Sequence, residues 1–309
     1  MGRTLSAMEE VEAYAISARE LKRAKLLADK YGFAMAYGSY DEMLRDKKVD
    51  VVYVSTPNSH HFEHTKAALL HGKHVVCEKA FTLNEAQAKE LCDLAKSSGL
   101  FLMEAMWTRF MPYVAKLKTL LQSGAIGEVH SVNITFGIYR PKRERLFVAE
   151  LGGGALLDIG LYPITFTTLV FGEDIENIDS AAVLNGNGVD IQHVIVLRYR
   201  DGKMAVLHSS IATEMGQRAI IYGTEGQITI DQFVCARQIR VFKDSEAEPQ
   251  VYDFPFEING YEYEIRAAAA DIAAGRLENA VMPHVETLRM MRLYDDLRRK
   301  WGVVFPQEK

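Results

Sequence analysis

Apolar runs alternate with amphipathic stretches through the first 105 residues of the chain. The short runs predict strands, and the longer stretches carry apolar residues at helical spacing. The predicted strands are residues 11–17, 49–56, 74–78 and 100–105, and the predicted helices are residues 20–32, 41–46, 59–70 and 83–99. Nearly continuous apolar strands separated by helices are typical of a parallel sheet that is covered on both faces. We therefore expect a doubly wound α/β domain in this part of the chain.

The pattern changes after a predicted helix at residues 112–122, where long segments alternate apolar and polar positions. Alternation with a period of two, broken by glycine-containing turns, predicts antiparallel strands. These segments are residues 129–139, 193–202, 203–211, 218–230 and 237–244, with helices predicted at 162–170, 261–274 and 284–299. The prediction is a doubly wound parallel-sheet domain over residues 1–122 and an α+β domain with a mostly antiparallel, open sheet over residues 123–309. Small ligands are expected in a cleft between the two.

The composition narrows the class of protein. A chain of 309 residues with 48% hydrophobic positions is longer than a single core usually grows, which supports two domains. A net charge of -5, with scattered basic residues, predicts no nucleic-acid partner. The three cysteines, Cys77, Cys92 and Cys235, form no CxxC pair, which favours a reducing compartment. Without an uncharged run of about 18 residues or a signal-peptide pattern, we expect a cytoplasmic protein that has no contact with membranes.

Two short motifs follow predicted parallel strands. Thr56, Pro57 and Asn58 end one strand and open a helix, and Glu78 and Lys79 end the next strand. The carboxyl ends of parallel strands form the ligand-binding edge of open α/β sheets, so both motifs are candidates for a binding site. The first motif also fits an ordinary turn with a helix N-cap, and Lys79 also fits a solvated surface lysine.

A third motif, LGGGALLDIGLYP, occupies residues 151–163. Three glycines precede a helical segment in which Asp158 and Tyr162 are four residues apart, so their side chains share one helix face. A carboxylate and a phenol on one face, beside glycines that permit close approach, make a candidate pair for proton transfer. The alternative is a glycine turn followed by a core tyrosine.

Together these motifs resemble the Gfo/Idh/MocA oxidoreductase family, in which segments of the type TPNxxH, EKP and GGGxLxDxGxY follow one another in this order. Here they read TPNSHH, EKA and GGGALLDIGLY, and the resemblance extends over YGTEGQI at residues 222–228 and the helix at 284–299. The tyrosine variant is similar to the dihydrodiol dehydrogenase and glucose-fructose oxidoreductase branch. The resemblance implies hydride transfer between a nicotinamide cofactor and a sugar or trans-diol, and a homodimer formed through the open sheet of the second domain.

The resemblance also implies roles for individual residues. Tyr162 would be the acid or base, Lys79 would favour its phenolate by Coulomb attraction, since an ordinary tyrosine has a pKa of about 10, and Asp158 would orient the substrate or the lysine. Arg19, at the end of the first predicted strand, could pair with a 2'-phosphate, which favours NADP over NAD, although it also fits a surface charge. Trp107 and Arg109 would line the substrate site or serve domain packing. The expected cofactor-binding residues are Arg19, Thr56, Pro57, Asn58, His61, Glu78 and Lys79.

Two departures from the family pattern change these expectations. Ala80 replaces the proline of EKP, and only residues 1–10 precede the first predicted strand, where the family has a strand and a glycine-rich loop. We therefore expect an N-terminally incomplete nucleotide-binding domain with weak or no NADP binding, and the alternative is a non-catalytic paralogue that binds a sugar or a protein. The histidines His60, His61 and His64 are expected to act as polar caps, and no metal site is predicted.

Overall fold

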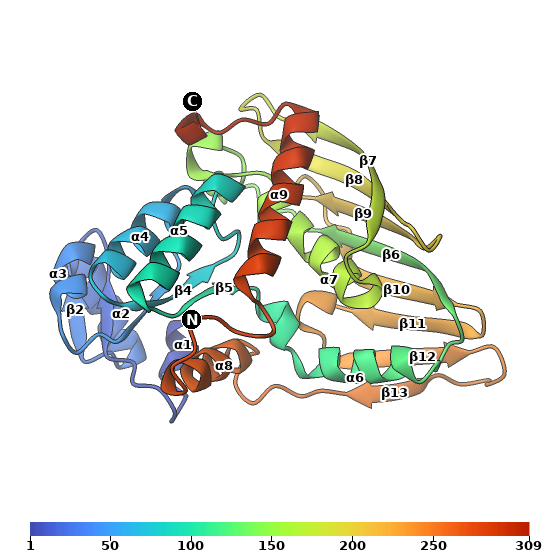
Figure 1. Cartoon of the computed structure of the whole chain (residues 1–309), viewed down its shortest axis with the longest axis horizontal. Helices are drawn as coiled ribbons and strands as arrows, with labels where there is room; N and C mark the ends of the chain where they lie inside the picture. Colours follow the sequence, from blue (N-terminus) through green and yellow to red (C-terminus); the bar gives the residue numbers. More distant parts are fainter. Residues whose placement is uncertain (309) are drawn as a thin grey trace. The chain divides into compact units, whose positions relative to one another are not determined.

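The computed structural model describes residues 1–308, which divide into two compact units (Figure 1). The first unit contains Met1–Trp107 and Phe256–Met291, and the second contains Thr108–Pro255 and the residues from Arg292 onward. These units do not coincide with the single boundary predicted after residue 122. The segment 256–291 joins the first unit because it pairs with early residues: the amide of Leu102 donates to the carbonyl of Leu277, and His284 Nε2 lies 2.8 Å from the carbonyl of Leu102.

The first unit is built on parallel strands flanked by helices. The strands are β1 Ala15–Ser17, β2 Met35–Tyr37, β3 Val51–Val54, β4 His74–Glu78 and β5 Leu102–Ala105. The helices are α1 Gly2–Leu5, α2 Leu21–Tyr31, α3 Tyr40–Arg45, α4 His61–Leu70, α5 Glu85–Ser98 and α8 Glu262–Ala273. All strand pairs are parallel, with β1 beside β2 in one sheet and the order β3-β4-β5 in another. Within residues 1–308 no strand joins these two sheets.

Local sequence signals explain where these helices begin and end. Asn84 caps α5, because its Oδ1 accepts a hydrogen bond of 2.9 Å from the amide of Gln87. Gly99 ends α5 and Gly32 ends α2, both in the left-handed conformation that favours glycine. The strands β4 and β5 are almost fully buried, as expected for a parallel sheet that is covered on both faces.

The second unit is built on one sheet of eight strands in the order β13-β12-β11-β10-β6-β9-β8-β7. The strands are β6 Val129–Gly137, β7 Ile175–Leu184, β8 Asp190–Tyr199, β9 Met204–Ser210, β10 Gly216–Gly223, β11 Gly226–Asp231, β12 Gln238–Lys243 and β13 Gln250–Asp253. Neighbouring strands are antiparallel except β6 and β9, which are parallel. Buried and exposed positions alternate along the strands, so one face of the sheet holds the core.

The helices α6 Pro112–Gln122 and α7 Leu161–Phe171 pack against this sheet (Figure 1). The helix α9 His284–Trp301 begins in the first unit and ends in the second. The continuous helical stretch Ala149–Phe171 is long and apolar enough to cross a membrane by composition, but 83% of its most apolar window is buried inside the protein. Such burial is typical of the core helix of a globular domain.

Candidate active site

The motifs after β3 and β4 lie at the same edge of the parallel sheet. Parallel pairing sets Val54 opposite Cys77, so the residues that follow each strand emerge side by side. Thr56 and Pro57 are half-buried and Asn58 is buried, in the turn that leads to α4. Lys79 is half-buried directly after β4, and the Lys79–Ala80 peptide bond is cis.

His61 links the two strand ends from within α4. Its Nδ1 lies 2.7 Å from the carbonyl oxygen of Ala80, and its Nε2 lies 2.8 Å from the carbonyl oxygen of Thr56. A neutral imidazole has one N–H and can donate to one of these carbonyls, whereas an imidazolium could donate to both. Burial outweighs that preference and lowers the pKa of His61 to about 4. Neutral His61 therefore holds the backbone around Lys79 without adding charge.

The other two histidines of this segment have different partners. His60 occupies the N-cap position of α4 without a side-chain capping hydrogen bond, so the capping prediction is wrong for this residue. His64 Nδ1 lies 3.1 Å from the hydroxyl of Thr56, and the His64 ring packs against Tyr40 with centroids 4.5 Å apart. Across residues 1–308 there is no group of three or more His, Cys, Asp or Glu side chains arranged to hold a metal ion.

Glu78, the last residue of β4, belongs to a group that the sequence did not reveal, in which Glu78 and Tyr53 are half-buried and Glu264 is buried. The hydroxyl of Tyr53 on β3 lies 2.7 Å from Glu78 Oε1 and 3.3 Å from Oε1 of Glu264 on α8. Burial raises the pKa of both carboxyl groups, and it raises the pKa of Tyr53 as well. The bond from Tyr53 lowers the carboxyl pKa values, but by less than burial raises them.

In the second unit, the glycine run allows the chain to fold tightly on itself. A Cβ on Gly153 would lie 2.7 to 2.9 Å from the carbonyl oxygens of Val148, Arg145 and Leu146, so only glycine fits there. The amides of Gly153 and Gly154 donate to carbonyls of this same loop. The close approach brings Arg145 to Asp158, with Nη1 3.0 Å from Oδ1. The sequence predicted the close approach but not this ion pair.

Asp158 lies in a π-helical turn, Leu156–Gly160, that runs directly into α7. The turn is held from β8 by Asp190, whose Oδ2 accepts from the amide of Leu156 at 2.8 Å and lies 2.9 Å from His193 Nδ1. A Cβ on Gly160 would lie 2.5 Å from the His193 ring, which explains the glycine. Single π-helical turns often occur at functional sites. Asp190 and His193 are therefore the residues that sequence reasoning missed here.

Tyr162 is the second residue of α7 and is 7% exposed. Its ring lies near Phe136 of β6, with centroids 6.0 Å apart. Tyr162 and Asp158 thus belong to one continuous helical stretch, as expected, and both lie in the second unit. Lys79 lies in the first unit, so each unit carries part of the predicted catalytic set.

The remaining predicted residues are distributed between the units. Arg19 is exposed two residues after β1. Trp107 is half-buried and stacks on Tyr261, with ring centroids 4.2 Å apart and planes 10° apart. Arg109 is half-buried, beyond Thr108, whose hydroxyl donates to the carbonyl of Val234. Trp107 belongs to the first unit and Arg109 to the second.

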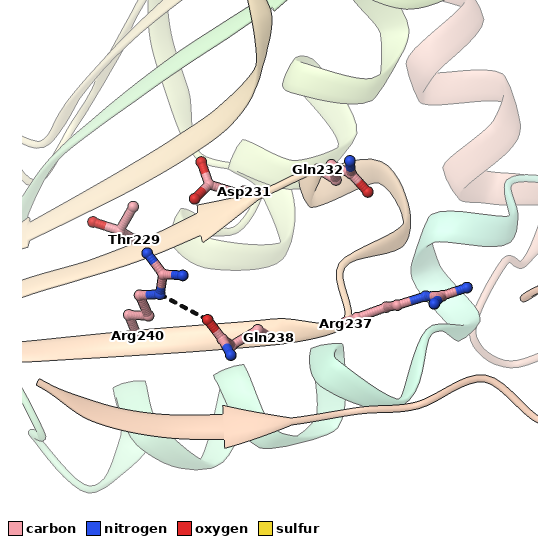
Figure 2. Close-up of a pocket in the computed structure, with 6 residues that line it drawn as sticks. All are labelled: Thr229, Asp231, Gln232, Arg237, Gln238 and Arg240. Atoms are coloured by element: carbon pink, nitrogen blue, oxygen red, sulfur yellow. Dashed lines mark hydrogen bonds between the residues drawn. The ribbon is translucent and has the colours of Figure 1, made fainter.

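A cavity of about 190 Å³ lies apart from all of these residues, on the polar side of β11 and β12 (Figure 2). Arg240 Nε donates to Gln238 Oε1 at 2.7 Å within it. The cavity is lined by Thr229, Asp231, Gln232, Arg237, Gln238 and Arg240. None of the predicted site residues contributes, and the cavity is open to solvent, so it is not the candidate active site.

The fold and the strand-edge motifs define a class, that of nucleotide-binding oxidoreductases with a parallel-sheet domain and a mostly antiparallel second domain. Residues 2–106 match the oxidoreductase family model with an NAD-binding Rossmann fold, and residues 114–229 match the GFO/IDH/MocA C-terminal domain. The chain belongs to the Gfo/Idh/MocA oxidoreductase family. The predicted fold class and the family resemblance are thereby confirmed.

Individual relatives cover nearly the whole chain. Trans-1,2-dihydrobenzene-1,2-diol dehydrogenase of Danio rerio is 35% identical over 312 residues, which are 99% of this chain and 93% of the relative. The protein of the same name from Xenopus tropicalis is 33% identical over 312 residues, which are 98% of this chain and 93% of that protein. These matches do not support the expected loss of a first strand and loop.

Among solved structures, a 3-ketoreductase from Actinomadura kijaniata in complex with NADP and TDP-benzene superposes with a TM-score of 0.89. It is 28% identical, and the match covers 96% of this chain and 92% of that one. Another structure of that enzyme, in complex with NADP, gives a TM-score of 0.85 at 26% identity. The architecture of the two units is therefore that of nicotinamide-dependent family members.

Proposed function

We propose that this protein is an NADP-dependent oxidoreductase that acts on a sugar or trans-diol type alcohol or ketone. The proposal rests on one observation, the similarity at 35% identity to a trans-1,2-dihydrobenzene-1,2-diol dehydrogenase over 99% of the chain. The structure with NADP and TDP-benzene supports the cofactor and the wider class of substrate. The protein would oxidise an alcohol when an alcohol is supplied and reduce a ketone when a ketone is supplied.

The proposed chemistry assigns one task to each polar side chain. A bound nicotinamide supplies the atom that accepts or donates hydride. Tyr162 exchanges a proton with the substrate oxygen, which must lose its proton when the alcohol is oxidised. Lys79 favours the phenolate of Tyr162 by its positive charge. Asp158, held by Arg145, orients the substrate hydroxyl.

Variants of a related enzyme are consistent with this assignment. Solved structures of the 3-ketoreductase include a variant with tyrosine replaced by phenylalanine and variants with lysine replaced by alanine or glutamate. A tyrosine and a lysine were therefore the side chains chosen for substitution in that protein. Tyr162 and Lys79 are the corresponding types of residue in the motifs of this chain.

The described residues fit two parts of the dinucleotide. Arg19, exposed after β1, suits a 2'-phosphate, and the edge formed by Thr56, Asn58, Glu78 and Lys79 suits the ribose and amide of the nicotinamide half. We expect calorimetry to show NADPH binding, with Arg19→Ala weakening NADPH but not NADH.

The main test is turnover of a trans-dihydrodiol with NADP at high concentration, followed by the absorbance of reduced nicotinamide. Tyr162→Phe should lower kcat by about 10²-fold or more, the range of general acid or base catalysis. Lys79→Met should give a similar loss. Tyr139→Phe is the matched control, because Tyr139 is 52% exposed and outside the motifs. If Tyr162→Phe retains most of the wild-type rate, the proton-transfer assignment is wrong.

A non-catalytic protein that binds a sugar or a protein is the second candidate. It predicts that the chain binds the diol or a sugar in calorimetry while no nicotinamide is reduced at saturating NADP. Turnover that depends on Tyr162 and Lys79 excludes it. Binding that is unaffected by either substitution, without turnover, would support it.

We also propose a homodimer formed through the exposed face of the eight-stranded sheet. Exposed apolar side chains lie on strands of this sheet, including Val183 on β7 and Met204 and Val206 on β9, the strands on either side of β8. Exposed apolar patches on a sheet mark interaction surfaces. Light scattering should give a dimer at micromolar concentration and a monomer for Val206→Asp. A wild-type monomer at that concentration would contradict the proposal.

A further inference from the structure

Two carboxyl groups in the first unit share one phenol. The Tyr53 hydroxyl lies 2.7 Å from Glu78 Oε1 and 3.3 Å from Glu264 Oε1. Glu264 is 0% exposed, and its other oxygen, Oε2, is buried without a hydrogen-bond partner. A phenol has a single proton to donate, so it can satisfy only one of the two carboxylates.

Keeping both Glu78 and Glu264 ionised beside Tyr53 would cost a large amount of free energy. Like charges repel strongly where water is excluded, and a buried carboxylate without a partner loses its hydration. A proton on Glu264 removes both problems. The protonated carboxyl then donates to the Tyr53 oxygen, and Tyr53 donates to Glu78, so that one chain of hydrogen bonds satisfies all three groups.

The surroundings decide which carboxyl keeps the proton. Glu78 has the shorter bond from Tyr53 and is close to the positive charge of Lys79. Glu264 has only the longer contact, and burial is the main influence on its carboxyl group. Tyr261 is the other titratable group near Tyr53. Charge therefore favours an ionised Glu78 and a neutral Glu264.

We propose that Glu264 is a positioning residue that stays protonated and, through Tyr53, holds ionised Glu78 in place beside Lys79. The proposal rests on the proposed function for its effect on catalysis, because Glu78 and Lys79 are consecutive residues at the end of β4. The protonation of Glu264 and its hydrogen bond to Tyr53 do not depend on the proposed function. The protonated state of Glu264 can be measured without substrate or cofactor.

Infrared spectroscopy of the intact chain near neutral pH tests the protonation. The wild type should show the C=O stretch of a buried carboxylic acid, and this band should be absent in Glu264→Gln. Glu150→Gln is the matched control, because Glu150 is exposed and its substitution should leave the band unchanged. A wild-type spectrum without the band, or a band that persists in Glu264→Gln, would overturn the proposal. Circular dichroism checks that each variant is folded.

Kinetics tests the positioning role. An amide resembles a protonated carboxyl in shape and neutrality and donates through its N–H, so Glu264→Gln should keep kcat and KM for the diol within about twofold. Tyr53→Phe interrupts the chain and should lower kcat about tenfold with a smaller change in KM, as expected for one lost hydrogen bond to a charged group. Glu264→Leu should resemble Tyr53→Phe. If Glu264→Gln loses activity as fully as Glu264→Leu, an ionised Glu264 is required and the proposal fails.

The two proposals fail in distinguishable ways. If the wild type does not turn over a diol but shows the infrared band, the proposed function is wrong and the protonated Glu264 stands as a structural feature. If the wild type turns over the diol and lacks the band, the oxidoreductase assignment stands and the positioning role of Glu264 is wrong.

Discussion

The two regions that carry the predicted catalytic residues treat buried charge in opposite ways. At the edge of the parallel sheet, Glu264 and His61 have no partner of opposite charge, and their nearest polar contacts are a phenol and backbone carbonyls. At the glycine turn of the second unit, Asp158 forms an ion pair with Arg145, and Asp190 Oδ2 accepts from the amide of Leu156 and lies 2.9 Å from His193 Nδ1. Acidic and histidine side chains are therefore held neutral in the first region. In the second region they lie beside a polar partner.

This difference follows from how each region is built. Parallel strands buried on both faces leave little space for long basic side chains, so protonation is the available way to satisfy an acid there. The glycine turn folds a loop tightly against the helix and delivers Arg145 from only 13 residues away. The stability contributed by the neutral groups should depend strongly on pH. The stability contributed by a group with a close polar partner should depend strongly on that partner. The four predictions below test this contrast.

The largest effect is expected for Asp190→Leu in the second unit. The substitution leaves His193 Nδ1 and the amide of Leu156 buried without their acceptor, and each buried donor left unsatisfied costs about 2 kcal/mol. Urea unfolding should be followed in a Trp107→Phe background, where Trp301, stacked on His193 at 5.1 Å, is the only tryptophan left of two. Asp201→Ala, at an exposed position, is the control. A cost equal to that of the control would show that Asp190 is not a matched group.

The next effect concerns His61 and pH. Its pKa is lowered to about 4 in the folded protein, so the unfolded state binds the proton first as the pH falls below 6.5. Stability from His61 is therefore present above pH 6.5 and lost toward pH 4, by about 3 kcal/mol. His61→Gln should remove this part of the acid sensitivity in urea titrations at pH 7 and pH 4.5. An equal acid loss in variant and wild type would contradict a neutral, buried His61.

Gly160→Ala should have an intermediate effect. The new Cβ would lie 2.5 Å from the His193 ring, and overpacking of this kind costs about 2 kcal/mol. Gly186→Ala is a matched control, because a Cβ there meets nothing within 4 Å. Comparison of the two by urea unfolding measures how tightly β8 holds the π-helical turn. Equal stabilities would mean that His193 can move aside.

The smallest effect at neutral pH is expected for Glu264→Gln, within about 1 kcal/mol of wild type, because the amide replaces a neutral acid. The pKa of Glu264 is raised above its ordinary value of 4.5, so the folded state holds a proton that the unfolded state has lost. Wild-type stability should then fall as the pH rises from 4.5 through the raised pKa, and the variant should lack this part of the slope. Parallel pH profiles for the two proteins would exclude a raised pKa at Glu264.

Much of the fold could be predicted because the two hydrophobic periods differ so clearly. Predicted strand 74–78 coincides with β4, and predicted helix 112–122 coincides with α6. The strands β2, β7 and β13 were missed. The edge strand β7 carries Glu176 and Asp179 and has no fully buried position, so its alternation is weak, and edge strands commonly carry charge in this way.

Only part of the candidate site could be predicted from the sequence. The ends of β3 and β4 and the glycine run were found because turn residues and strand ends are local signals. Glu264 was not found, although an acid four residues before Ala268, on the buried face of α8, was an available signal. Asp190 and His193 gave no local signal, since they lie on a strand whose pattern was read only as alternation.

The sequence by itself determined the periods, the turns and the order of the motifs, because these depend on residues close together in the chain. Tertiary structure alone decided which polar groups meet. The hydroxyl of Tyr53 contacts Glu264, 211 positions away, and the amide of Leu156 contacts Asp190, 34 positions away. Whether a buried acid is matched or protonated depends on the distance to its partners and on the exclusion of water. Both are set by packing between distant segments, which a local pattern cannot encode.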